Sequence, residues 1–184
     1  MGKITFYREW LLLDKKDFRI LTMLADKGAF QGNLSDICRY FSLNPQQRNR
    51  NQIRESIQRL KKVQMITCEV KGRNYTLGLI PKEKEISIQR NWLYTLRRHE
   101  YKKEHVSWEA VLKVLLWIID NKEQIVTNNE IANDLGVSLT TVVSAKNVLE
   151  REYRAIIRRK VSIKTGENSF CTIGQELTAS AWWP

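Results

Sequence analysis

The sequence has little glycine or proline and no long apolar run. Glycine (8) and proline (3) are scarce, and hydrophobic residues make up 42% of the 184 positions. This composition excludes collagen-like, disordered and linker-dominated chains. The longest apolar run, residues 114–119, is far shorter than the roughly 18 residues that a bilayer span needs. Charged residues 14–17 follow a short apolar run directly, so we expect no secretory signal and no membrane segment.

Cysteine and histidine are scarce as well. Cys38, Cys68 and Cys171 form no Cys-x-x-Cys pair, and their odd number leaves one outside any disulfide scheme. Reduced thiols in a cytoplasmic protein are the simplest interpretation, with association to the nucleoid if the source is bacterial. His99 and His105 lack the spacing of a zinc-binding HExxH motif and have no cysteine nearby, so we expect no metal site.

Catalytic signatures are also missing from the sequence. It has no GxxxxGK[ST] phosphate loop, no G-x-S-x-G elbow and no GxGxxG turn, which argues against a helicase or another nucleotide-dependent enzyme. The acidic residues are scattered and mostly precede predicted helices, where they act as caps, and they do not pair as in a metal-dependent nuclease. We therefore expect a non-catalytic protein without a cofactor.

Positive charge is what the chain has in excess, with 31 Lys and Arg against 20 Asp and Glu, a net charge of +11. The net charge is +8 over residues 1–80, +3 over residues 81–106 and zero over residues 107–184. Two clusters stand out, each opposed by a single glutamate: Arg48, Arg50, Arg54, Arg59, Lys61 and Lys62, then Arg151, Arg154, Arg158, Arg159, Lys160 and Lys164. Many such clusters are only solvated helix faces, but a net excess this large indicates a polyanionic partner such as nucleic acid.

The pattern of apolar residues occurs twice along the chain. The aligned segments are 18–26 with 112–120, 36–43 with 130–137, and 52–60 with 141–149, the first copy holding five extra residues around positions 45–49. Identity between the copies is low, but the apolar positions and their spacing agree. The sequence therefore predicts two copies of one small domain, at residues 1–80 and 107–184, joined by a basic connector at residues 81–106.

Each copy is predicted to contain three helices followed by a β-hairpin. In the first copy, Asp14 caps a helix that runs to about residue 27, Asn33 and Asp36 open a second helix, and Asn44-Pro45 starts the third. In residues 65–70 and 75–79 the apolar pattern has a period of two, as in a β-strand. The turn between these segments contains glycine and asparagine, so the sequence predicts a hairpin. In the second copy the helix starts are Ser107, the capping box Thr127 with Glu130, and Ser138, and the strands fall near residues 155–163 and 169–173.

The second copy resembles the winged helix-turn-helix family of DNA-binding domains. The residues that carry the resemblance are Asn129-Glu130-Ile131-Ala132, Leu135-Gly136-Val137-Ser138, Thr141-Val142, Ala145 and Leu149. The first copy is similar more loosely, since its turn lacks the glycine and carries the five extra residues. The resemblance implies a helix-rich α+β protein of two tandem winged helices. It also implies that the third helix enters the major groove of double-stranded DNA and that the hairpin, or wing, touches the backbone or minor groove.

The resemblance also places DNA-contacting residues in both copies. In the first copy these are Gln46, Gln47, Arg48, Asn49, Arg50, Asn51 and Arg54 on the third helix, with Lys71 and Arg73 in the wing. In the second copy they are Ser138, Thr140, Thr141, Lys146, Arg158, Arg159 and Lys164. Arg can bridge guanine O6 and N7, and Asn or Gln can bridge adenine N6 and N7. The third helix of the second copy is less polar, so we expect that copy to bind DNA more weakly or to favour a protein partner.

Three functions fit these features. One is sequence-specific, non-catalytic binding of double-stranded DNA by a transcriptional regulator. Another is an origin-binding replication initiator of a plasmid or phage-like element, and the third is a tandem winged-helix adaptor between proteins. The net charge and the Arg/Asn/Gln-rich helix favour DNA over the adaptor. The amphipathic connector residues Trp92, Leu93 and Leu96 indicate packing between the domains, while self-association or a protein partner through the second copy and the connector is the alternative.

Overall fold

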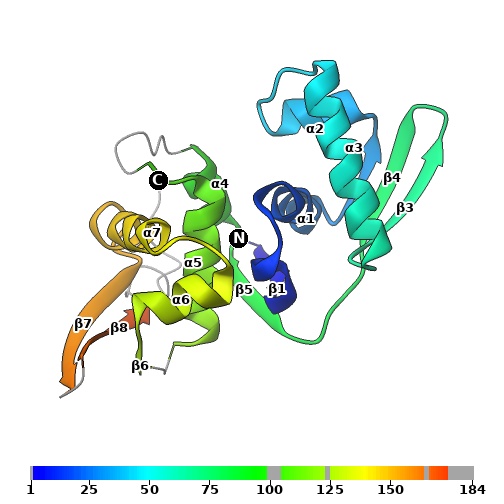
Figure 1. Ribbon diagram of the computed structural model, residues 1–184. Coiled ribbons are helices and arrows are strands. Elements are labelled where there is room, and N and C mark those ends of the chain that lie inside the picture. The colour runs from blue at the N-terminus through cyan, green and yellow to red at the C-terminus, as the bar shows by residue number, and fades with distance from the viewer. Residues whose placement is uncertain (1, 99–104, 123–124, 164–165, 174–184) are drawn as a thin grey trace. The chain divides into compact units, whose positions relative to one another are not determined.

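The computed structural model describes residues 2–98, 105–122, 125–163 and 166–173, with only the backbone described for Ile125 and for residues 157–163 and 166–173. The fold is helix-rich α+β. The chain divides into two compact units, Met1–Arg90 and Asn91–Pro184 (Figure 1). Within the described residues, no helix has the length and apolar character that crossing a membrane requires.

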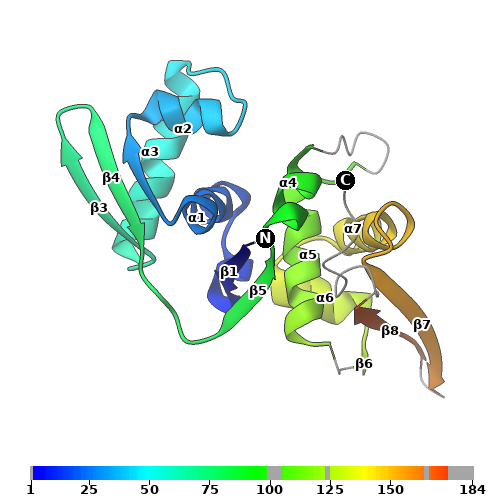
Figure 2. The ribbon, with the colours of Figure 1, turned by 180° about the vertical axis from the view of Figure 1, so that it is seen from behind.

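The first unit combines three α-helices with two small sheets. Its elements are β1 (Lys3–Tyr7), the 3-10 helix η1 (Arg8–Leu12), α1 (Lys15–Lys27), β2 (Ala29–Gly32), α2 (Leu34–Tyr40), α3 (Gln47–Lys62), β3 (Ile66–Lys71), β4 (Asn74–Leu79) and β5 (Glu85–Gln89). An antiparallel sheet has the order β2-β4-β3, and β1 pairs with β5 in a separate antiparallel ladder. The β3–β4 hairpin runs beside α3 in both ribbon views (Figures 1 and 2).

The second unit repeats the order of α1 to β4. After α4 (Arg90–Arg98), which begins at the boundary, come α5 (Trp108–Asp120), β6 (Ile125–Val126), α6 (Asn128–Leu135), α7 (Leu139–Arg151), β7 (Ile156–Ile163) and β8 (Gly166–Ile173). The sheet order is β6-β8-β7. In both units, therefore, a short strand after the first long helix pairs with the second strand of the hairpin.

Most helix starts are set by the capping residues that the sequence predicted. Asp14 Oδ1 accepts hydrogen bonds from the backbone N–H groups of Lys16 (2.7 Å) and Asp17 (2.9 Å). Asn33 with Asp36, and Thr127 with Glu130, form reciprocal capping boxes. These backbone donors have no partner inside their own helix, so a nearby side-chain oxygen fixes where the helix begins. The predicted caps at these three helices are confirmed.

The predicted start of the third helix was wrong by two residues. The helix α3 begins at Gln47 with Gln46 at the N-cap, whereas Asn44-Pro45 was expected to supply the cap and the first residue. The Asn44 carbonyl accepts hydrogen bonds from Gln46 N (2.8 Å) and from Asn49 Nδ2 (2.8 Å). These bonds hold residues 44–46 in a turn, so the helix starts only after it.

The core of the first unit lies where the apolar stripes of α1 and α3 meet. The apolar residues Phe18, Ile20, Leu21 and Leu24 of α1 and Ile53, Ile57 and Leu60 of α3 are all buried. Burial of such side chains is the main source of folding free energy. Ile4, Phe6 and Trp10 from β1 and η1 are also buried, although no pattern in the sequence predicted a structure for them.

Residues 81–106, expected to form a connector, are divided between the two units as far as they are described. β5 is a ladder partner of β1 and buries Ile86 and Ile88 in the first unit. The helix α4 continues into the second unit and buries the amphipathic residues Trp92, Leu93 and Leu96. Residues 99–104 lie outside the described residues.

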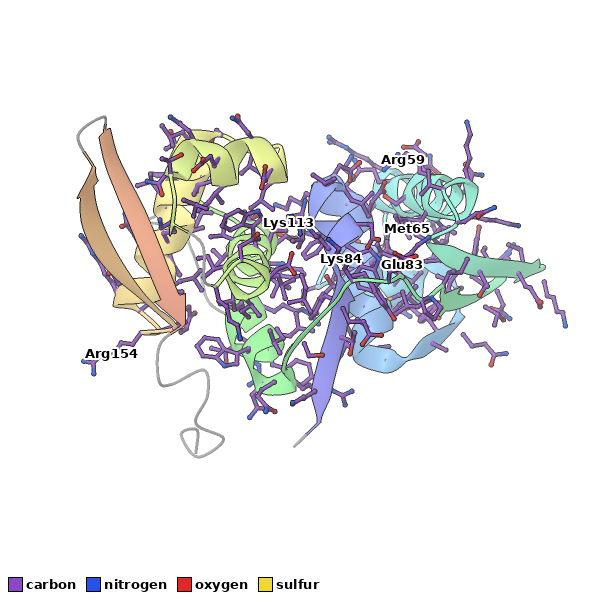
Figure 3. The ribbon with its side chains drawn as sticks, turned by 90° about the horizontal axis from the view of Figure 1, so that it is seen from below. Arg59, Met65, Glu83, Lys84, Lys113 and Arg154 are labelled. Atoms are coloured by element: carbon purple, nitrogen blue, oxygen red, sulfur yellow. The ribbon has the colours of Figure 1, made fainter. Side chains whose placement is uncertain are left out.

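A cluster of ion pairs links the C-terminal half of α3 to the start of α1. Arg59 donates to Asp17 through Nη2 (2.7 Å) and Nε (3.0 Å), and to Asp14 through Nη2 (3.2 Å); Figure 3 labels Arg59. The Asp17 side chain is only 8% exposed, so the guanidinium compensates a nearly buried carboxylate. The hydrogen bond to Asp17 raises the pKa of Arg59, which stays charged. Arg59, a member of the basic cluster, therefore stabilises the fold.

Replacing Arg59 with methionine is expected to lower the free energy of unfolding by about 1–3 kcal/mol, because Asp17 loses a charged hydrogen-bond partner that water replaces poorly. Urea denaturation followed by circular dichroism measures this change. Lys62→Met is the matched control, since Lys62 is exposed in the last turn of the same helix and should change stability by less than about 0.5 kcal/mol. Equal losses in the two variants would contradict the role of the ion pair.

Candidate nucleic-acid interface

A polar hollow of about 740 Å³ lies between α2, α3 and the β3–β4 turn. Its lining includes four arginines, one from α2, two from α3 and one from the turn: Arg39, Arg50, Arg54 and Arg73. Gln47, Asn74 and Tyr75 contribute further polar groups. None of the described residues that line the hollow is acidic. The hollow therefore offers a concentration of hydrogen-bond donors and positive charge to a ligand.

The helical period of α3 explains why these side chains gather. Ile53, Ile57 and Leu60 point into the core, and Gln47, Arg50 and Arg54, at i, i+3 and i+7, lie along the neighbouring face. The turn brings Arg73 to the same hollow because Gly72 adopts a positive φ of 61° and closes a tight connection in which Lys71 pairs with Asn74. The core packing and one glycine turn thus assemble the site.

Hydrogen bonds join the polar side chains of α3 to one another. Gln47 Oε1 accepts from Arg50 Nη2 (3.0 Å), and Gln47 Nε2 donates to Asn51 Oδ1 (2.8 Å). Asn51 Oδ1 also accepts from Arg54 Nη1 (3.1 Å). Two arginines and two amides therefore form a connected chain over two turns of the helix, which restricts the rotamers of all four side chains.

Arg39 lines the hollow, although it was not among the residues predicted to contact DNA. Its Nη1 forms an ion pair with Asp36 Oδ1 (2.8 Å), while Asp36 Oδ2 accepts from the backbone N–H of Asn33 (2.9 Å) in the capping box of α2. The capping carboxylate thus also orients this arginine. A single arginine on a short helix does not by itself indicate a binding site. The only indication in the sequence is the i, i+3 spacing of Asp36 and Arg39, which is typical of an ion pair on a helix.

Five other predicted residues of the first unit do not line the hollow: Gln46, Arg48, Asn49, Asn51 and Lys71. Gln46, Arg48 and Lys71 are exposed to solvent. Asn49 is half-buried and donates to the Asn44 carbonyl, so it stabilises the turn before α3. Asn51 acts on the hollow indirectly, through its bonds to Gln47 and Arg54. The predicted run of contacts is therefore divided among different faces of one helix.

In the second unit, the predicted site residues Ser138 and Thr141 have a structural role. Ser138 Oγ accepts from the backbone N–H of Thr141 (3.1 Å), and the two hydroxyls lie 2.8 Å apart, so both side chains are used in capping α7. Thr140 is exposed, next to Leu139, which is 46% exposed. The side chains of Arg158 and Arg159, and the whole of Lys164, lie outside the described residues.

The prediction that Lys146 contacts DNA was wrong. The Lys146 side chain is fully buried, and its Nζ donates to Asn128 Oδ1 (2.8 Å) at the start of α6. A buried ammonium is tolerated when a polar group compensates its lost hydration, and here it ties α7 to α6. The prediction assumed that Lys146 lies on the exposed face of α7, whereas it lies on the buried face.

The hollow is suited to binding anions. Guanidinium groups donate to phosphate and to the acceptor atoms of nucleobases, and the amides of Gln47 and Asn74 both donate and accept. The described lining contains no histidine, cysteine or carboxylate that could transfer a proton or attack a substrate. Across the described part of the chain, no three His, Cys, Asp or Glu side chains gather in a way that could hold a metal ion.

Chemical acetylation is expected to distinguish the buried lysine from the exposed ones. In the folded protein, an N-hydroxysuccinimide ester should modify Lys71 and Lys62 early and leave Lys146 unmodified, because its Nζ is inaccessible. Mass spectrometry of proteolytic fragments measures the three sites, and all three should react in urea. Modification of Lys146 as fast as Lys71 in the folded protein would contradict its burial.

The hollow, its arginines and its amides make this face of the first unit the strongest candidate for a binding site among the described residues. No protein-family model matches the sequence, and no curated protein shows a significant match to it.

Proposed function

We propose that the protein binds double-stranded DNA sequence-specifically, without catalysing a reaction, and acts as a transcriptional regulator. The observation that carries this proposal is the hollow between α3 and the β3–β4 turn, with four arginines and no acidic residue in its described lining. The phosphates of DNA give it a high density of negative charge, and its major groove is wide enough to admit an α-helix. A polar, arginine-rich helix face beside a hairpin suits that target.

In this proposal each unit is a winged helix. The supporting features are the shared order of helix, short strand, two helices and hairpin, and the corresponding sheet orders β2-β4-β3 and β6-β8-β7. The pair α2–α3 is the helix-turn-helix of the first unit and β3–β4 its wing. The corresponding elements of the second unit are α6–α7 and β7–β8.

The side chains of the hollow divide into two roles under this proposal. Gln47, Arg50 and Arg54 lie along α3, the element that enters the groove. Arg39 and Arg73 come from the elements next to α3, where contacts to the DNA backbone are expected. Contacts to phosphate fix the register of a protein on DNA, and contacts to base edges specify the sequence.

The second unit contributes less to DNA affinity in this proposal. The start of α7 presents the exposed Leu139 and Thr140, where α3 presents glutamine and arginine. Lys146, the cation predicted for this helix, is buried. A surface of this kind supports weaker DNA binding or contact with a protein partner, as expected from its sequence.

Affinity for duplex DNA is expected to fall steeply as salt rises from about 50 to about 200 mM, because binding releases counterions from the phosphates. Replacing both Arg50 and Arg54 with alanine should remove the preference for the target over random DNA, at a cost of about 1–3 kcal/mol per base contact. Fluorescence anisotropy over a salt series measures both effects. Lys62→Ala, a loss of one charge on the same helix outside the hollow, should keep the sequence preference.

Three outcomes of this experiment separate the candidate functions. Salt-sensitive binding to single promoter sites supports a regulator, and binding to iterated sites at an origin supports a replication initiator instead. Absence of salt-sensitive DNA affinity, together with tight binding to another protein, would overturn the proposal in favour of an adaptor.

A further inference from the structure

We infer that the first unit reads guanines through Arg50 and Arg54, and that Gln47 and Asn51 hold these two arginines in position without reading adenine. The inference rests on the proposed binding of DNA by α3 and adds the bases that it recognises. It changes the role that the residue types alone suggested, since Asn and Gln commonly bridge adenine N6 and N7.

The amide groups of α3 are already engaged with neighbouring side chains. Reading adenine requires an amide oxygen that accepts from N6 and an amide nitrogen that donates to N7. Asn51 Oδ1 accepts from both Gln47 Nε2 (2.8 Å) and Arg54 Nη1 (3.1 Å), which occupies both of its lone pairs. Gln47 is held at its two ends by Arg50 and Asn51. An adenine contact by Asn51 would therefore break a bond that already exists in the free protein. Gln47 uses one lone pair and one N–H in its two bonds, and these bonds restrict its rotamer.

The arginines, in contrast, keep most of their hydrogen-bonding capacity. A guanidinium has five N–H donors, and Arg50 and Arg54 each use one in their bond to the neighbouring amide. The remaining fork can bridge guanine O6 and N7, the commonest specific contact in the major groove. Because one nitrogen of each fork is anchored, less rotamer entropy is lost when the base binds.

The spacing of the two arginines limits where the guanines lie. Arg50 and Arg54 are four residues apart, line the same hollow, and are separated by about 6 Å along the helix axis. For a helix that runs along the groove, this length corresponds to about two base-pair steps. The target is therefore expected to contain two guanines, on either strand, within about two steps of each other.

Base substitution in the DNA tests this inference directly. The full-length protein is first used to select its site from a randomised duplex pool, and each guanine of the enriched site is then replaced with 7-deazaguanine, which lacks the N7 acceptor but pairs normally. We expect affinity to fall about tenfold for each of two guanines, with an unchanged salt dependence because the phosphate contacts remain. In Arg50→Lys, the penalty should shrink at one guanine and persist at the other.

A matched pair of variants tests the positioning role of Asn51. Asn51→Leu removes the acceptor for Gln47 and Arg54, so the preference for guanine over 7-deazaguanine should drop severalfold. Asn51→Asp retains an acceptor and should retain that preference. Thermal unfolding of both variants checks that they fold.

The outcomes separate this inference from the proposed function. Salt-sensitive binding to an enriched site without guanine would overturn guanine reading. A loss of affinity on replacing an adenine with 7-deazaadenine that disappears in Asn51→Leu would overturn the positioning role of Asn51. Both outcomes leave DNA binding intact. Failure to enrich any duplex, with no salt-sensitive affinity, would overturn the proposed function itself.

Discussion

The packing of α3 against α1 decides which side chains of the first unit can meet a ligand. Ile53, Ile57 and Leu60 are buried in this contact, and Arg59 binds the nearly buried Asp17 at the start of α1. Together they fix the rotation of α3 about its own axis. Once one face of the helix is buried, its period places Gln47, Arg50 and Arg54 on the neighbouring face, so the candidate site is a consequence of the core.

Features of the fold that depend on local interactions could be predicted from the sequence. Asp14, Asn33 and Thr127 cap helices because their side chains bond to backbone groups two or three residues away. The pairing of β1 with β5 could not be predicted, because it joins residues such as Lys3 and Gln89 that are distant in the chain and carry no turn signal between them. The short strands β2 and β6 were missed for the same reason.

The candidate site was predicted in part, and the limit was again tertiary structure. Arg50, Arg54 and Arg73 were identified from residue type and position and do line one hollow. Arg39 was missed because only folding brings α2 to the same place. Lys146 was assigned to a surface, although it is buried and its Nζ donates a hydrogen bond to Asn128. Residue type indicates which chemistry is available, and the fold decides which residues can use it.

The central claim is that this hollow is where the protein contacts DNA. Nuclear magnetic resonance of ¹⁵N-labelled protein titrated with its selected duplex tests it most directly, because the Nε–H signals of individual arginines can be followed. The account predicts that the signals of Arg39, Arg50, Arg54 and Arg73 shift on binding, whereas that of Arg59, held by Asp17, does not. Shifts confined to the second unit, with the signals of the arginines in the hollow unchanged, would contradict this claim.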